Sequence, residues 1–283
     1  MELIIKHFDS LGSLRSFLET HKVNKVFAGK SLSSQDTSKN TYNFTGTHSY
    51  EEAMDLFTNG WHTEAEILTG KLNTMKIDKG FREKMNYDVV GFQASVPRYL
   101  QGIPTNMINK KKVAQKQKII TITKNCSYLS VVSKEAIQKS NILALHLVRT
   151  LEAKGYKVNL NYLNVTAGKK QAIITKIKLK AANERLNISK LAFPLVHPSM
   201  MRRIMFRYRE VLPELTDTDF AWGYGNSLAG EKVLRENKRQ VLKDNEYYIP
   251  SIIDEKFIED WFVNNVDYRV SQICCGTASR DFD

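Results

Sequence analysis

The chain has 283 residues, 42% of them hydrophobic and 25% charged, which is typical of a globular protein and unlike a disordered or fibrous chain. Lys and Arg number 42 against 30 Asp and Glu, and the formal charge of +12 favours an acidic partner such as nucleic acid, anionic lipid or an acidic protein. The N-terminus is not a signal peptide and no segment is apolar for long enough to span a bilayer, so we expect a soluble protein without a membrane partner.

The first 117 residues are predicted to form a smaller, α-rich region. Apolar residues at helical spacing indicate helices at LGSLRSFLET, at YEEAMDLFTN and around EAEILTGKLNTMKI. Ser49 caps the second of these, with Glu52 placed to complete a capping box, and Gly60 ends it. NKVFAG is predicted as a strand, and residues 30–47 as a loop because Ser, Thr, Asn and Gly dominate there.

Prolines and lysines mark the end of this region. ASVPRYLQGIPTNMI, with Pro97 and Pro104, predicts an ordered turn-rich segment or a broken helix. NKKKVAQKQK, residues 109–118, has five lysines and low hydrophobicity, which favours an exposed loop. We therefore place a boundary after residue 117, with a second domain over residues 118–283.

The second domain begins with regular elements. The continuous apolar run KIITIT predicts a buried strand. Ser133 caps a long helix predicted over residues 134–154, which Gly155 ends. Alternating apolar residues predict one strand over residues 156–162 and another over 173–179, and the lysines interleaved in the latter indicate a solvent-exposed face.

The order of these elements predicts the topology. Strand, long helix and strand form a βαβ unit, so the first two strands are expected to be parallel, whereas the short loop VTAGKKQ predicts a hairpin between the second and the third. HPSMMRRIMFRYREVL predicts a helix, YYIPSI a short strand, and DEKFIEDWFVNNV a closing helix capped by Asp254. The predicted fold class is α/β: a mixed, mainly parallel sheet flanked by helices, with the smaller α-rich N-terminal region.

Motifs for cofactors and metals are incomplete. Gly29-Lys30-Ser31 has the end of a phosphate-binding loop, but Asn24 stands where that loop needs its first glycine. The six histidines are scattered, without the spacing of zinc ligands. Cys126, Cys274 and Cys275 do not make a disulfide framework, which favours a reducing cytosol. No cofactor and no metal are predicted.

Asn125, Ser127 and His197 form a candidate pocket. The first two end the strand KIITIT, where a doubly wound sheet binds ligands. At the level of fold this resembles a von Willebrand A-type domain, in which an aspartate and two serines hold a divalent metal, but Asn125 replaces the aspartate. His197 precedes a helix whose dipole disfavours its protonation, so a neutral packed or capping histidine is expected, with a catalytic base as the alternative.

The helix after Pro198 carries a predicted basic edge. Apolar residues at helical spacing form one face, and the arginines fall largely outside it. Those arginines would bind phosphate or an acidic surface, or pair with acidic residues of neighbouring helices. The predicted contact residues for nucleic acid or an acidic partner are Lys110, Lys111, Lys112, Lys116, Lys118, Arg202, Arg203, Arg207 and Arg209.

Four blocks between Ser49 and Glu210 carry a family resemblance. They are SYEEAMDLFTNGW, DVVGFQASVPRYLQGIPTNMI, the run ending LVRTLEAKGYKVNLNY, and LAFPLVHPSMMRRIMF. Together they resemble an uncharacterised family, a domain of unknown function found in bacteriophages and bacterial genomes. The resemblance implies phage or prophage origin, and with it the host cytoplasm. It implies no reaction, so no catalytic residue is carried over.

These observations favour a protein that acts by binding and not by catalysis. The expected ligand is nucleic acid or an acidic phage or host protein. A virion or assembly component is the alternative. An enzyme with a dispersed active site is a third reading, which requires Asp88, His197, Glu210 or other acids to converge in one pocket.

Overall fold

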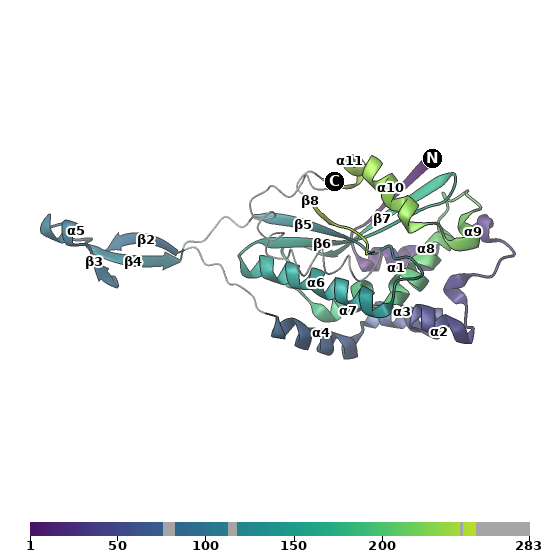
Figure 1. Ribbon diagram of the computed structural model, residues 1–283, viewed down its shortest axis with the longest axis horizontal. Helices are drawn as coiled ribbons and strands as arrows, with labels where there is room; N and C mark the ends of the chain where they lie inside the picture. Colours follow the sequence, from purple (N-terminus) through teal and green to yellow (C-terminus); the bar gives the residue numbers. More distant parts are fainter. Residues whose placement is uncertain (76–82, 113–117, 244–245, 253–283) are drawn as a thin grey trace.

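The computed structural model describes residues 1–75, 83–112, 118–243 and 246–252. It consists of an α/β body around a five-stranded sheet and an arm, residues 83–112, with a three-stranded sheet of its own (Figure 1). Within these described ranges, no helix is both long and apolar enough to cross a membrane.

The sheet of the body is mixed and mainly parallel, as predicted, with the strand order β1-β7-β6-β5-β8. Its strands are β1 (Glu2–Phe8), β5 (Ile119–Asn125), β6 (Lys157–Ala167), β7 (Gln171–Lys180) and β8 (Glu246–Ile249). β5 runs parallel to β6 and to β8, β1 runs parallel to β7, and β6 and β7 are antiparallel. The carboxyl ends of β5, β6 and β8 therefore lie at the same edge of the sheet.

The predicted βαβ unit and hairpin are both confirmed. α6 (Lys134–Ala153) joins β5 to β6, and the Ser133 hydroxyl at its start accepts a hydrogen bond from the Ala136 amide at 3.1 Å. Gly155 follows the helix with φ +89°, a conformation that glycine adopts without strain. This unit supplies the centre of the sheet, and β8, which matches the predicted strand YYIPSI, extends it beyond β5.

The solvent-exposed face predicted for β7 is only partly present. Lys178 is exposed, but Lys180 is 2% exposed and its Nζ lies 2.7 Å from Glu152 Oε1. Lys176 forms an ion pair of 2.5 Å with Glu246. Because β7 lies inside the sheet, between β1 and β6, two of its lysines are withdrawn from water and need carboxylate partners.

Helices cover both faces of the sheet (Figure 1). The face with the larger core carries α6, α7 (Ile188–Val196), a π-helical turn (Met200–Ile204) and α8 (Met205–Val211). The other face carries α10 (Ser227–Glu236) and α11 (Lys238–Val241), which follow the short α9 (Phe220–Gly223). The closing helix predicted from Asp254 lies outside the described residues.

The N-terminal residues belong to the body. β1, which was not predicted, pairs with β7 from Glu2–Gln171 to Phe8–Ile177. The three predicted helices are present as α1 (Leu11–Thr20), α3 (Tyr50–Asn59) and α4 (His62–Thr74). A 3-10 helix (Lys25–Phe27) replaces the predicted strand, and α2 (Lys39–Thr45) lies in the predicted loop. Leu14, Phe57 and Leu68 of these helices share one core with β5 and β6, on the other side of the boundary expected after residue 117.

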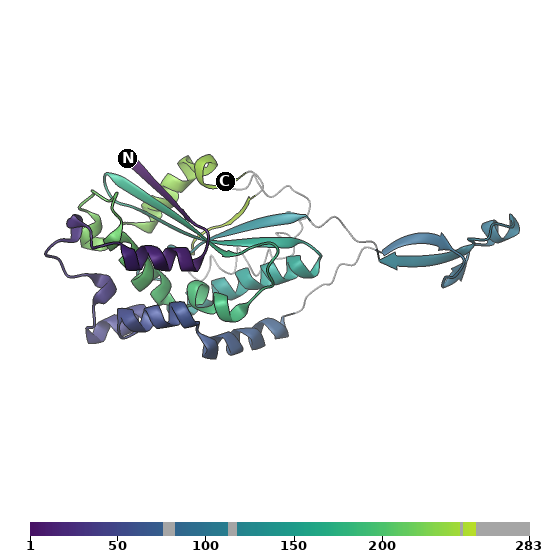
Figure 2. The same cartoon turned by 180° about the vertical axis from the view of Figure 1, so that it is seen from behind.

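The part that stands apart is the arm. It comprises β2 (Glu83–Asp88), β3 (Gln93–Ala94), α5 (Val96–Leu100) and β4 (Met107–Lys112), with the strand order β2-β4-β3. Residues 109–112 are therefore in a strand, whereas a loop was predicted. In two opposite views the arm extends away from the body (Figures 1 and 2).

Candidate interaction surface

Asn125 and Ser127 hold the loop after β5 in place. The Asn125 side-chain amide donates hydrogen bonds to Glu231 Oε2 (2.6 Å) and to the Tyr248 hydroxyl (2.9 Å), and its Oδ1 accepts from the Ser127 amide (3.0 Å). The Ser127 hydroxyl accepts from the Val165 amide of β6 (2.6 Å). Across the described part of the chain, no group of three or more His, Cys, Asp or Glu side chains is placed to hold a metal ion.

His197 lies elsewhere, between α7 and the π-helical turn, and is 7% exposed. Its ring stacks on Phe193 (centroids 5.2 Å apart) and meets Trp61 edge-on (4.6 Å), while Nδ1 accepts a hydrogen bond from the Ser199 amide (3.1 Å). Burial, with the charge of Lys134, lowers the pKa of His197 to about 4. The ring is therefore neutral near pH 7 and serves as a packed cap at the start of a helix.

Asp88, His197 and Glu210, the residues named for an enzyme, do not meet in one pocket. Glu210 is fully buried on α8, where its carboxylate accepts hydrogen bonds from the amide and hydroxyl of Ser34 and from the Tyr224 hydroxyl. Asp88 lies on β2 of the arm, away from the body. The contacts of His197 are with aromatic rings and the Ser199 amide.

Arg202 and Arg203 do not form an exposed basic edge, because both are buried. Arg202 donates hydrogen bonds to the carbonyl oxygens of Phe44 (2.7 Å) and Val132 (3.1 Å), and Arg203 to those of Ser34 (2.8 Å) and Asp36 (2.7 Å). Both residues lie in the π-helical turn, whose wider repeat displaces side chains from the positions that a regular α-helix predicts. The two guanidinium groups therefore anchor neighbouring loops.

Arg207 and Arg209 are also withdrawn from the surface. Arg207 Nη1 lies 3.5 Å from Glu210 Oε2, and its side chain is 16% exposed. Arg209 is 3% exposed, and its Nη2 donates a hydrogen bond to Asn164 Oδ1 at 2.7 Å. The four arginines are therefore not placed to contact a macromolecule at the surface.

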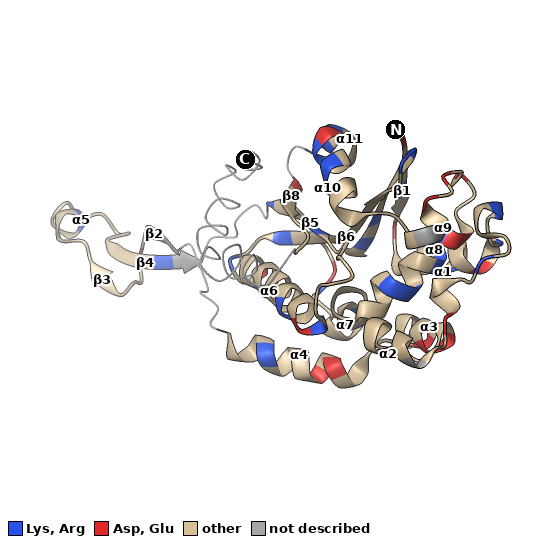
Figure 3. Ribbon diagram, turned by 45° about the vertical axis from the view of Figure 1, so that its right-hand side comes forward, with Lys and Arg blue, Asp and Glu red and all other residues tan. Residues whose placement is uncertain are grey.

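The predicted lysines lie on or beside the arm. Lys110, Lys111 and Lys112 are in β4, and Figure 3 shows basic residues on β4 and on α5. Lys118 is exposed just before β5, and Lys116 lies outside the described residues. The arm carries five basic residues, Lys84, Arg98, Lys110, Lys111 and Lys112, against two acidic ones, Glu83 and Asp88.

Aromatic rings of the arm lie against basic groups. Residues directly opposite each other on antiparallel strands share a face, so Tyr87 and Ile108 lie together. The Arg98 guanidinium carbon is 4.2 Å from the centre of the Tyr87 ring, and Arg98 Nε donates to the Thr105 carbonyl (3.0 Å), which ties α5 to this face. Lys110 Nζ lies 5.6 Å from the centre of the Phe92 ring.

No described side chain of the arm is buried. Eight large apolar side chains are 46–78% exposed: Met85, Tyr87, Val89, Val90, Phe92, Val96, Tyr99 and Leu100. A cluster of exposed apolar side chains marks a binding surface. These residues were not predicted as a binding surface, although the run DVVGF places three large apolar residues beside a turn, where a solvated hairpin needs polar ones.

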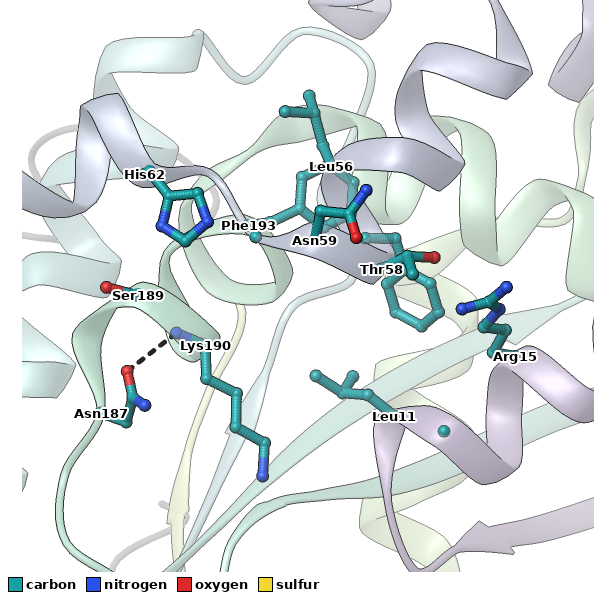
Figure 4. Close-up of a pocket in the computed structure, with 13 residues that line it drawn as sticks. Leu11, Arg15, Leu56, Thr58, Asn59, His62, Asn187, Ser189, Lys190 and Phe193 are labelled. Carbon is teal, nitrogen blue, oxygen red and sulfur yellow. Dashed lines mark hydrogen bonds between the residues drawn. The ribbon is translucent and has the colours of Figure 1, made fainter.

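A pocket of about 370 Å³ lies on the body, between α1, the turn from α3 to α4, and the start of α7 (Figure 4). Arg15, His62 and Lys190 line it from these three elements. Arg15 Nε is paired with Glu19 Oε1 at 2.7 Å, and Asn187 caps α7 by accepting the Lys190 amide at 3.1 Å. Arg15 and Asn187 therefore already form bonds within their own helices.

A protein family described as Domain of unknown function (DUF7192) matches residues 2–263. The chain belongs to this family. The matched span includes both the body and the arm, so the DUF7192 domain contains the two parts. The expected membership of an uncharacterised family is confirmed, whereas phage origin and a von Willebrand A-like core stay predictions. No curated protein and no solved structure matches the DUF7192 chain.

Proposed function

We propose that this protein binds nucleic acid through the arm and has no catalytic role in doing so. One observation carries the proposal: exposed aromatic rings lie against basic groups, Arg98 on Tyr87 and Lys110 on Phe92. Nucleic-acid bases stack on open aromatic faces, and phosphates pair with Lys and Arg beside them. The arm supplies both kinds of contact within 30 residues of chain.

The charge of the chain supports the same partner. The arm has a basic surplus, and the whole sequence carries a formal charge of +12. Neutralising phosphates releases counterions, and this supplies much of the affinity of any protein for nucleic acid. Arg202, Arg203 and Arg209 of the body are buried, whereas the basic residues of the arm lie on an element that extends away from the body.

Aliphatic side chains of the arm also suit nucleic acid. Val90 is 72% exposed and Leu100 is 78% exposed. Proteins that deform nucleic acid insert apolar wedges of this kind between base steps, next to Lys or Arg. We infer that the arm contacts bases as well as phosphates. The phage origin and host cytoplasm implied by the family resemblance are the setting that we propose for this binding.

Fluorescence anisotropy with labelled single-stranded and double-stranded oligonucleotides of 20 nucleotides tests the proposal. We expect binding at low salt whose logarithm falls linearly with the logarithm of salt concentration. Tyr99→Ala removes a ring that is 67% exposed and should weaken binding about tenfold, because one base stack contributes about 1–3 kcal/mol. Lys110→Gln should reduce the salt slope by about 0.7–0.9.

Tyr42 provides a matched control on the body. It is 41% exposed on α2, and Lys134 Nζ lies 5.2 Å from the centre of its ring, so it also pairs an aromatic ring with a cation. Tyr42→Ala should leave oligonucleotide binding unchanged. The proposal fails if the protein does not bind either oligonucleotide at low salt, or if Tyr42→Ala weakens binding as much as Tyr99→Ala.

A second candidate function is a virion or assembly component that docks on an acidic protein. It is favoured by the aliphatic residues Val89, Val90, Val96 and Leu100 of the arm, which are 61–78% exposed and which contact with another protein would bury. Mass spectrometry of purified particles of the encoding phage tests it. Stoichiometric presence that Val90→Asp with Leu100→Asp abolishes supports assembly, and absence from particles contradicts it.

A further inference from the structure

A pocket of about 400 Å³ lies at the carboxyl ends of β5 and β6. Its walls are the loop after β5 (Ser127 to Ser130), the end of β6 (Val165 and Thr166), the turn from Gly223 to Ser227, and Arg209 of α8. In α/β sheets, ligands bind in the crevice beyond the carboxyl ends of parallel strands. The place of this pocket in the fold is therefore that of a ligand site.

Arg209 brings a buried positive charge to this pocket, with its guanidinium carbon 5.4 Å from the centre of the Phe206 ring. Its side chain is 3% exposed, its Nη2 donates to Asn164 Oδ1, and its Nε has no hydrogen-bond partner. Among the described residues, no carboxylate forms an ion pair with Arg209. Burial lowers the pKa of Arg209 and the charge of Glu210 acts to raise it, but the Glu210 carboxylate is bonded to Ser34, Tyr224 and Arg207. A charge that is withdrawn from water without an ion-pair partner is unfavourable, so an anion is expected here.

The other buried arginines, Arg202 and Arg203, form more hydrogen bonds than Arg209 does. Arg202 also leaves its Nε unpaired, but its Nη atoms donate to four carbonyl oxygens, those of Phe44, Leu129, Ser130 and Val132. Arg203 is bonded by its Nη atoms to three carbonyl oxygens and by Nε to the Thr47 hydroxyl. Arg209 has a single bond to an amide oxygen, although burial lowers its pKa only to about 10 and leaves it charged at neutral pH.

The wall formed by the turn from Gly223 to Ser227, against the end of β6, is fixed in shape. Tyr224 has φ +58°, a left-handed conformation that is uncommon for a residue other than glycine, and its hydroxyl is held by Glu210 (2.5 Å) and the Ser33 amide (2.7 Å). Gly225 cannot be replaced there, since an added Cβ would lie 2.2 Å from Thr166 Oγ1. This turn leads into the N-terminus of α10, whose dipole favours an anion.

We propose that this pocket binds a phosphate group through Arg209. The guanidinium fork matches phosphate oxygens, and the hydroxyl residues Ser127, Ser130, Thr166 and Ser227 line the same space. Two kinds of ligand would present such a phosphate group, namely free phosphate and a phosphate monoester. The monoester fits the volume better, because its organic part would lie against Phe206 and Tyr224, whose rings stack 4.3 Å apart.

Isothermal titration of the full chain with orthophosphate, adenosine 5′-monophosphate and adenosine tests the site. We expect the monophosphate to bind and adenosine, which lacks the phosphate, not to bind. Tighter binding of the monophosphate than of orthophosphate assigns the site to an ester, and equal binding assigns it to the free ion. Arg209→Gln should weaken binding at least tenfold, whereas Arg15→Gln, in the pocket of Figure 4, should not change it.

A second variant keeps the test decisive if Arg209→Gln does not fold. Ser227→Asp introduces a carboxylate into the pocket lining at the first residue of α10, where an acidic side chain favours the helix. It should abolish phosphate binding and leave the melting temperature unchanged or raised. The inference is overturned if neither phosphate compound binds at millimolar concentration, if adenosine binds as tightly as its monophosphate, or if Ser227→Asp binds phosphate as the unaltered protein does.

Discussion

His197 gives the stability of the protein a dependence on pH that the structure allows us to work out. Its ring is 7% exposed, and burial together with the charge of Lys134 lowers its pKa from 6.5 to about 4. In the unfolded chain the imidazole returns to a pKa of about 6.5. Between these two values the unfolded chain binds more protons than the native protein, so the free energy of unfolding falls as the solution is acidified.

With these two pKa values, His197 lowers the free energy of unfolding by about 2 kcal/mol between about pH 7.5 and pH 5, and its contribution is constant above pH 7.5. His197→Asn removes the titrating ring, and the asparagine oxygen can accept the Ser199 amide in place of Nδ1. The packing lost against Phe193 and Trp61 lowers the stability of the variant by the same amount at every pH.

Urea unfolding, followed by circular dichroism for both proteins across this pH interval, measures the effect. The unaltered protein should lose about 2 kcal/mol more than His197→Asn on acidification. The pKa of His7 is also lowered by burial. Because His7 is present in both proteins, it does not contribute to the difference between their free energies of unfolding. Parallel curves for the two proteins would refute the view that His197 is held neutral by burial.

Four further substitutions can be measured in the same urea experiment. Gly230→Ala should lower the free energy of unfolding by about 1–3 kcal/mol, because its Cβ would lie 2.7 Å from the Thr166 amide nitrogen, and an unchanged value would show that α10 can move away from β6. Arg202→Met should lower it by about 1–3 kcal/mol, because buried carbonyl groups lose their donor; a neutral effect would mean that they find other donors. Ser133→Ala should lower it by about 1 kcal/mol through loss of the α6 cap, and a change near zero would show that the cap bond adds nothing. Leu100→Asp should change it by less than about 0.5 kcal/mol, since the side chain is 78% exposed, and a larger loss would indicate that the arm packs on something.

The elements that could be predicted from sequence are those with a long, regular pattern and a clear cap. α6 and α3 begin at serines whose hydroxyls accept backbone amides, and their apolar residues repeat at helical spacing. β5, β6 and β7 follow one another along the chain, so their pairing needed only the length of each connection. The fold class followed from these local patterns.

What could not be predicted depends on partners distant in the chain. The strand at Glu2–Phe8 has its partner in β7, and a seven-residue run does not show which segment will pair with it. The positions of Arg202 and Arg203 depend on a π-helical turn that leaves no signal in apolar spacing. The candidate sites were predicted only in part: Arg209 was expected at an exposed basic edge and not inside a pocket, because its role depends on which groups surround it, and Tyr99 was not predicted, because its role depends on the lack of anything packed over it.

The pairing of β1 with β7 has a consequence for biosynthesis. Glu2 leaves the ribosome well before Gln171, its neighbour in the sheet. At roughly 5–20 residues per second this delay is about 10–30 s. Throughout that time the apolar residues Leu3, Ile4 and Ile5 have no strand to join, so co-translational folding begins elsewhere and nascent chains need protection from aggregation until β7 emerges.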